Sequence, residues 1–161
     1  MSERPSDDDL MRECLREGET AERAGEVPVG ALVVCDGRIV ARAHNASIAT
    51  NDPSAHAEIL ALRAAGAVLG NYRLTDAELF VSVEPCLMCV GAIIQARLQR
   101  VVFGCADPKA GALGGCFDFS RHPDLNHRFA VRRGVCETEA RELLQRFFRA
   151  RRAAKTETTG S

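Results

Sequence analysis

Four residues in two short stretches of this chain have the types and spacing needed for metal-assisted hydrolysis. His56 and Glu58 lie two residues apart, and Cys86 and Cys89 follow about thirty residues later, directly after Pro85. Zinc binds Cys sulfur and His nitrogen in a tetrahedral shell, and a catalytic zinc has three protein ligands with the fourth position open to water. His56, Cys86 and Cys89 supply three such ligands. Glu58 is then available as general acid and base, because a carboxylate near the open position can pass a proton from water to a substrate.

The two stretches together are more informative than either alone. H-x-E is common by chance, and C-x-x-C also occurs in redox sites and in structural zinc sites. A closed structural site would need a fourth ligand from Cys35, His44, Cys105 or another spare Cys or His. The full pattern H-x-E…P-C-x-x-C is similar to the signature of the zinc nucleoside and nucleobase deaminases, and the resemblance implies their mechanism.

Length and composition set the expected organisation. The 161 residues suffice for one domain, so we expect a single zinc-dependent deaminase domain over residues 1–152 and a disordered tail over 153–161. Seven Cys and an N-terminus without an apolar signal segment favour a reducing compartment, which predicts a cytoplasmic protein. No apolar run approaches the roughly 18 residues of a membrane span, so no membrane association is expected.

Charge is distributed unevenly along the chain. Residues 1–85 carry 8 Lys and Arg against 15 Asp and Glu, a balance of -7, whereas residues 86–161 carry 13 against 7, a balance of +6. Such asymmetry is compatible with one basic face that meets phosphates. The alternative is a solvated helix face at the Arg-rich end.

Helical and strand patterns alternate around the chemical residues. Apolar spacing predicts helices over residues 7–24, 56–67, 85–97 and 137–150, strands over 29–34, 39–43, 78–83, 100–104 and 128–135, and loops over 46–52 and 107–115. His56 and Glu58 fall in the first turn of one helix, and Cys86 and Cys89 in the first turn of another. We therefore expect two positive helix ends at the metal. The alternation predicts an α/β domain with a mixed sheet.

Several further segments resemble the bacterial tRNA-specific adenosine deaminases, a family of the cytidine and deoxycytidylate deaminase superfamily. The similar segments are residues 26–31, 52–59, 71–74, 84–89, 101–104, 107–112, 126–128 and 147–149. The zinc motif is shared with cytosine and guanine deaminases, whereas NYRL, DPKAGA, NHR and FFR favour the tRNA enzymes. The resemblance implies a three-layer α/β/α fold with a central mixed five-stranded sheet.

The same resemblance implies the activity and the residues that perform it. It implies hydrolysis of adenosine to inosine at the wobble position (A34) of a tRNA anticodon stem-loop, by a homodimer with one zinc per subunit. His56, Cys86 and Cys89 resemble the zinc ligands and Glu58 the proton shuttle. The positions that resemble substrate contacts are Asn45, Ala57, Asp107, Lys109, Asn126, Phe148 and Arg149.

Two of these positions have structural alternatives, and so does the function. Asn45 follows a strand, a position that also suits a turn residue bound to its own backbone. Phe147 and Phe148 both fit a helix packing stripe, so one of them must lie in the core. A deaminase of free guanine or cytosine, or a non-catalytic zinc-stabilised RNA-binding module, would share the metal ligands. Glu58 argues against the module, which has no use for it.

Overall fold

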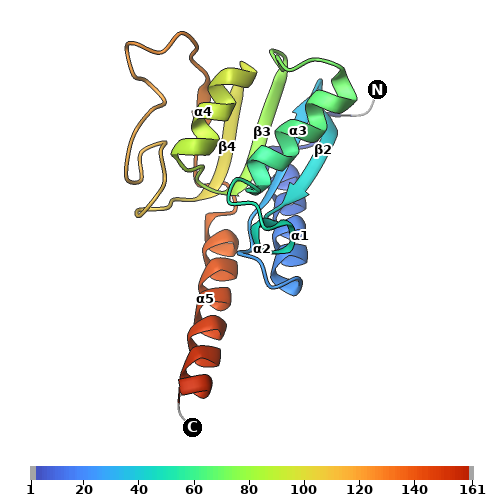
Figure 1. Cartoon of the computed structure of the whole chain (residues 1–161). Coiled ribbons are helices and arrows are strands. Elements are labelled where there is room, and N and C mark those ends of the chain that lie inside the picture. Colours follow the sequence, from blue (N-terminus) through green and yellow to red (C-terminus); the bar gives the residue numbers. More distant parts are fainter. Residues whose placement is uncertain (1–2, 160–161) are drawn as a thin grey trace.

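A five-stranded sheet forms the centre of the computed structural model, in which residues 3–159 are described (Figure 1). Its strands are β1 (Gly30–Cys35), β2 (Arg38–His44), β3 (Ala77–Val83), β4 (Arg100–Cys105) and β5 (Ala130–Arg132), in the order β2-β1-β3-β4-β5. β1 runs antiparallel to β2 and β3, whereas β3, β4 and β5 are parallel. The predicted mixed sheet is confirmed.

Helices cover both faces of this sheet and complete three layers. α1 (Asp7–Arg23) and the first half of α5 (Glu137–Thr159) lie on one face, and α3 (Ala57–Leu69) and α4 (Leu87–Ala96) lie on the other (Figure 1). The short α2 (Ser47–Thr50) precedes α3. In the part of the chain that the structure describes, no helix is long and apolar enough to cross a membrane.

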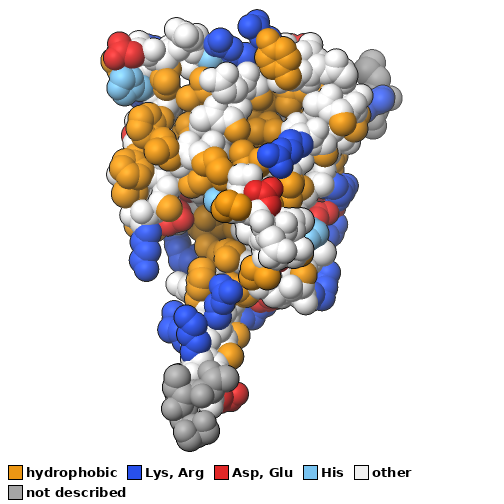
Figure 2. Space-filling view, in the orientation of Figure 1, with side chains coloured by type: hydrophobic (Ala, Val, Ile, Leu, Met, Phe, Trp, Pro, Cys, Tyr) orange, Lys and Arg blue, Asp and Glu red, His pale blue; other side chains and the backbone are white. Residues whose placement is uncertain are grey.

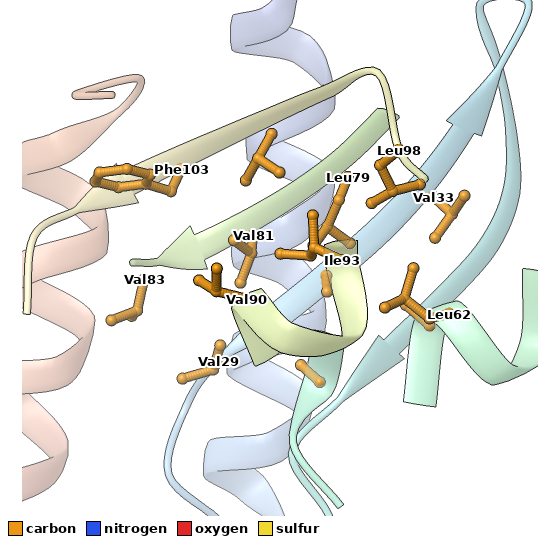
Figure 3. Packing of buried hydrophobic residues seen from close by; sticks show 14 of the residues in the cluster. Val29, Val33, Leu62, Leu79, Val81, Val83, Val90, Ile93, Leu98 and Phe103 are labelled. Atoms are coloured by element: carbon orange, nitrogen blue, oxygen red, sulfur yellow. The ribbon is translucent and has the colours of Figure 1, made fainter. Parts of the chain in front are cut away.

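Strand periodicity divides the core between the two faces. Leu32, Phe80 and Val102 pack against α1, and the alternate residues of the same strands face α3 and α4. Figure 3 shows this second half of the core, where Val90 and Ile93 of α4 lie over β3. Each fully buried side chain of this kind contributes about 1.5–3 kcal/mol to folding. The packing therefore holds α3 and α4 firmly against the sheet.

The carboxyl ends of β3 and β4 meet the start of α3 and α4. His56 is the N-cap residue of α3, and Cys86 is the N-cap residue of α4. The open crevice outside the carboxyl ends of parallel strands is a common ligand-binding position in α/β folds. The fold thus brings the two chemical stretches of the sequence to one edge of the sheet.

Three element boundaries differ from the sequence predictions. Residues 46–52, expected to be a loop, contain α2, whose Ile48 and Ala49 N–H groups donate to the buried Glu26 carboxylate at 3.0 and 2.8 Å. Pro85 lies before α4 and not inside it, because its carbonyl accepts a hydrogen bond from Ala112 N–H (2.9 Å). The last strand is confined to the three residues of β5.

The predicted disordered tail is corrected as well. α5 continues to Thr159, so residues 153–159 are helical, and residues 160–161 lie outside the described part. The physical reason is composition, since Ala153, Ala154 and Lys155 are strong helix formers and residues 137–159 contain neither Gly nor Pro. The second half of α5 projects from the body of the protein (Figure 1).

Candidate active site

His56, Cys86 and Cys89 form a three-membered ligand group at the edge of the sheet. Their ligand atoms all lie within 4.8 Å of one another. Nδ1 of His56 is 3.6 Å from the Cys86 sulfur and 3.5 Å from the Cys89 sulfur. A tetrahedral zinc, about 2.3 Å from sulfur and about 2.0 Å from nitrogen, separates such atoms by about 3.5 Å. The donor types and spacing therefore fit one zinc ion, with Nδ1 as the His56 ligand atom.

Among residues 3–159, no fourth His, Cys, Asp or Glu joins this group. His44, one candidate for a closed site, contacts Glu17 instead (3.2 Å). Three ligands and no fourth protein ligand are typical of a catalytic zinc site. The group therefore has the geometry of a catalytic site and not of a closed structural one.

The two thiols of the group are electrostatically unequal. A hydrogen bond from Cys89, supported by another from His56, lowers the pKa of Cys86 to about 4. The bond to Cys86, together with burial, raises the pKa of Cys89. A divalent cation favours the ionised form of both, because a coordinating thiol is deprotonated. Both also lie at the positive N-terminal end of α4, which stabilises thiolates.

Glu58 lies in the first turn of α3, beside the ligand group, and is 4% exposed. Burial raises the pKa of Glu58 to about 7, and the nearby Cys86 thiolate adds to this effect. A carboxyl group with a pKa near neutrality is suited both to take up and to release a proton. A cation beside it lowers this pKa again and favours the ionised form that accepts a proton.

Asn45 lies at the end of β2 and orients one side of the site. Its Oδ1 accepts a hydrogen bond from the Ala57 N–H at 2.7 Å, so its amide NH2 group is left for another partner. Asn45 lines the cavity in front of the ligand group, whereas Ala57 is buried behind it. Ala57 therefore contributes to the site by fixing the orientation of Asn45.

A cavity of about 990 Å³ opens in front of the ligand group. Its inner wall contains His56, Glu58 and Cys86, and a second wall is formed by residues 105–110. The third wall is α5, which contributes Arg141, Leu144, Gln145, Phe148, Arg149 and Arg152. The volume exceeds what a single base requires, and the α5 wall is aromatic and basic.

Most of the residues predicted to contact substrate lie in these walls. Asp107 and Lys109 belong to the second wall, and Phe148 and Arg149 to the third. Phe147 is the core residue of the aromatic pair, whereas Phe148 is 39% exposed and faces the cavity. The structure does not bring Asn126 to the cavity, since this residue lies exposed in the connection between β4 and β5.

Sequence reasoning missed several cavity residues. Arg141 and Gln145 were not predicted, although they lie seven and three residues before Phe148 along α5, which places all three on one helix face. Glu84 entered the sequence analysis only as the first residue of the similar segment 84–89, yet it lines the cavity as a buried carboxylate. No local sequence signal distinguishes it from a surface Glu.

A protein-family model and two bacterial proteins are similar in sequence to this chain. Residues 4–105 match the family model for the cytidine and deoxycytidylate deaminase zinc-binding region. The chain is 45% identical to a tRNA-specific adenosine deaminase of Haemophilus influenzae over 150 residues, covering 92% of this chain and 87% of that protein. It is 42% identical to the enzyme of the same name from Bacillus subtilis over 149 residues, covering 92% of each protein.

Solved structures agree with this assignment. A structure from work on A-to-I editing by tRNA:A34 deaminases at the wobble position superposes with a TM-score of 0.82 and 42% identity, over 84% of this chain and 98% of that one. A guanine deaminase of Nitrosomonas europaea superposes with a TM-score of 0.75 and 26% identity, over 88% and 84%. The chain belongs to the zinc-dependent cytidine and deoxycytidylate deaminase family, and within it to the tRNA-specific adenosine deaminases.

Proposed function

We propose that this chain hydrolyses adenosine to inosine at the wobble position (A34) of tRNA anticodons. The observation that supports it most directly is the α5 wall of the cavity, where Phe148, Arg149 and Arg152 lie in front of the zinc ligands and Glu58. An aromatic ring and cations beside a deep base pocket suit a nucleotide flipped out of an RNA loop. A free base has no phosphates for these cations to bind.

The residues of the cavity divide the reaction between them. His56, Cys86 and Cys89 would hold a zinc ion, and such an ion would lower the pKa of water so that a hydroxide nucleophile is available near neutral pH. Glu58 takes one proton of the attacking water and transfers it to the adenine ring nitrogen, and then takes the second proton, from the new C6 hydroxyl, and transfers it to the departing amino group. Water adds at C6 and ammonia leaves, which gives inosine. Cytidine-type chemistry at C4 of a pyrimidine would use the same residues.

Asn45 and the buried inner wall hold the base for this attack. The free NH2 group of Asn45 can donate a hydrogen bond to a ring nitrogen of the flipped base. Because Ala57 fixes the Asn45 side chain, little side-chain entropy is lost when the base binds. Such fixed positioning is an effective source of rate acceleration.

Turnover on defined substrates tests the proposal. An anticodon stem-loop with adenosine at position 34 should yield inosine, and the same stem-loop with guanosine there should not react. Free guanine and cytosine test the alternative deaminase. Activity on either free base without inosine formation in the stem-loop would contradict the proposal.

Phe148→Ala should weaken binding of the anticodon stem-loop by about 1–3 kcal/mol, the range for loss of one base-stacking aromatic. This corresponds to about a 5- to 150-fold higher Kd, measured by fluorescence anisotropy at fixed salt. Phe117→Ala is the matched control, because Phe117 is a similarly exposed aromatic outside the cavity. Equal Kd values for the two variants would exclude the stacking role.

We infer further that two copies of the chain associate through the outer face of α3 and α4. Exposed apolar side chains gather on this face (Figure 2), and the large ones on α3, α4 and the turn after α3 are Val68, Leu69, Tyr72, Leu87 and Met88. An exposed apolar area of this kind is typical of a protein interface. A second copy presents the same surface, as a two-fold symmetric dimer requires.

Light scattering tests the dimer. Wild-type protein should have twice the mass of one chain, and Val68→Asp should shift it towards one chain, because it places a charge within the apolar face. Phe117→Asp adds the same charge outside that face and should leave the mass unchanged. A wild-type mass of one chain at micromolar concentration would contradict the inference.

A tRNA substrate also favours the predicted cytoplasmic location.

A further inference from the structure

Glu84 is a buried carboxylate without a cationic partner among residues 3–159. It is 4% exposed, and no Lys, Arg or His of the described residues forms an ion pair with it. Burial of a carboxylate is costly unless its oxygens accept hydrogen bonds. The partners of Glu84 therefore indicate what it is for.

Those partners are backbone N–H groups of one loop. Oε1 accepts a hydrogen bond from Asp107 N–H (2.9 Å), and Oε2 accepts bonds from Leu113 N–H and Gly115 N–H (both 2.8 Å). The loop thus wraps around the carboxylate and is fixed at both ends by it. Hydrogen bonds to a charged acceptor are about twice as strong as neutral ones.

The loop approaches the carboxylate too closely for any side chain at two positions. A Cβ on Gly111 would lie 2.4 Å from Oε1 of Glu84, and a Cβ on Gly115 would lie 2.4 Å from the same oxygen. A Cβ on Gly115 would also lie 2.3 Å from the Asp107 carbonyl oxygen. Glycine is required at both positions because the backbone packs directly on Glu84.

The two ends of this arrangement are both parts of the active site. Glu84 is followed directly by Pro85 and the metal ligand Cys86, whose backbone pairs with Gly111. The loop that it holds carries Asp107 and Lys109 in the second wall of the cavity. Asp107 in turn accepts hydrogen bonds from Lys109 N–H and Ala110 N–H (3.0 and 3.2 Å). These bonds connect Asp107 to the next residues of the second wall.

We propose that Glu84 is a positioning residue for deamination: it fixes the substrate-facing loop 107–115 at a set distance from the metal-ligand segment. The effect of Glu84 on RNA binding rests on the proposed function, whereas its effect on the position of the loop does not. The hydrogen bonds of the carboxylate go to the loop, and Glu84 is not among the three ligand residues. Its loss should therefore affect how the RNA is held more than how the bond is broken.

The test compares Glu84→Gln with Glu78→Gln. Glutamine keeps the shape but replaces one acceptor oxygen with an NH2 group that faces N–H donors. Glu78 is the matched control, because it is equally buried in β3 at the opposite end of the strand, where it pairs with Arg4 and Arg100. In Glu84→Gln, kcat/KM on the A34 stem-loop should fall about 10- to 100-fold, mainly through KM.

Hydrogen exchange provides a readout that does not depend on the reaction. The amides of Asp107, Leu113 and Gly115 should lose protection in Glu84→Gln and keep it in Glu78→Gln, while zinc content stays at one per chain in both. Unchanged protection and KM in Glu84→Gln would overturn the proposal. So would loss of zinc, because Glu84 would then support the metal and not the loop.

A second pair of variants tests the proposal in case Glu84→Gln does not fold. Gly115→Ala pushes the loop off Glu84 without changing the carboxylate and should raise KM in the same way. Cys116→Ala is its control, since Cys116 follows Gly115 directly and its side chain is exposed. Equal KM for these two variants would contradict the proposal. If wild-type protein forms no inosine, the proposed function fails, while amide protection still decides the role of Glu84 in the loop.

Discussion

Replacing Glu58 with glutamine should lower kcat for inosine formation by about 10²- to 10⁴-fold, the contribution of a positioned general acid and base. Glutamine keeps the size of the buried side chain but cannot transfer the proton from water to the base. Zinc content and stem-loop affinity should remain those of the wild type, because Glu58 is not among the three ligand residues. Single-turnover assays at saturating enzyme isolate the chemical step from RNA binding.

Glu26→Gln is a suitable comparison for this variant. Glu26 is also buried, but its carboxylate accepts N–H groups of α2 and is not in the cavity. A chemical step within about threefold of wild type is expected for it. If Glu58→Gln reacted as fast as Glu26→Gln, another group would have to move the proton.

Loss of a zinc ligand should have a comparably large effect through a different route. Cys89→Ala leaves two ligands, so the chain should retain little zinc and no measurable activity. It should also lose the stabilisation that bound metal gives, which is about 4 kcal/mol when free zinc is at 1,000 times its Kd. Elemental analysis and thermal unfolding, each with and without a chelator, measure both consequences.

The control for Cys89→Ala is another thiol of the same chain. Cys116 is exposed and lies outside the ligand group, so Cys116→Ala should keep zinc, melting temperature and activity. A chelator should lower the melting temperature of this control and of wild type, but not that of Cys89→Ala. Full zinc content in Cys89→Ala would show that the ligand set is different.

The metal-ligand group and Glu58 were predictable because their residues lie in two short stretches of the sequence. His56 with Glu58, and Cys86 with Cys89, each fall within one helical turn, and an alternating strand directly precedes the second pair. The pattern therefore predicted the ligands, the helix ends and the neighbouring strand together. What the pattern could not give was the depth of the cavity, since α5 arrives from a distant part of the chain.

The errors at α2 and at the start of α4 share one physical cause, which is stabilisation by residues distant in the sequence. α2 depends on Glu26, about twenty residues earlier in the chain, and the start of α4 depends on pairing with the loop at Gly111. Neither contact can be inferred from the neighbouring residues in the sequence. Glu84 was overlooked for the same reason, because its three donors lie 23 to 31 residues away.

Some of the residues that form the cavity walls were predicted from the sequence. Phe148 and Arg149 were assigned from resemblance, and the structure places both in the cavity wall while Phe147 takes the core position. Asn126 lies on an exposed connection away from that cavity, and the RNA contacts of all three residues stay predictions. RNA long enough to reach beyond the cavity would be needed to test it.

Sequencing of tRNA anticodons from host cells with and without this protein tests the central claim most directly. Inosine is read as guanosine in complementary DNA, so position 34 of the edited tRNA should read as G in normal cells and as A when the protein is absent. Wild-type protein should restore the G signal, and Glu58→Gln should not. An unchanged G signal in cells without the protein would contradict wobble deamination as its function.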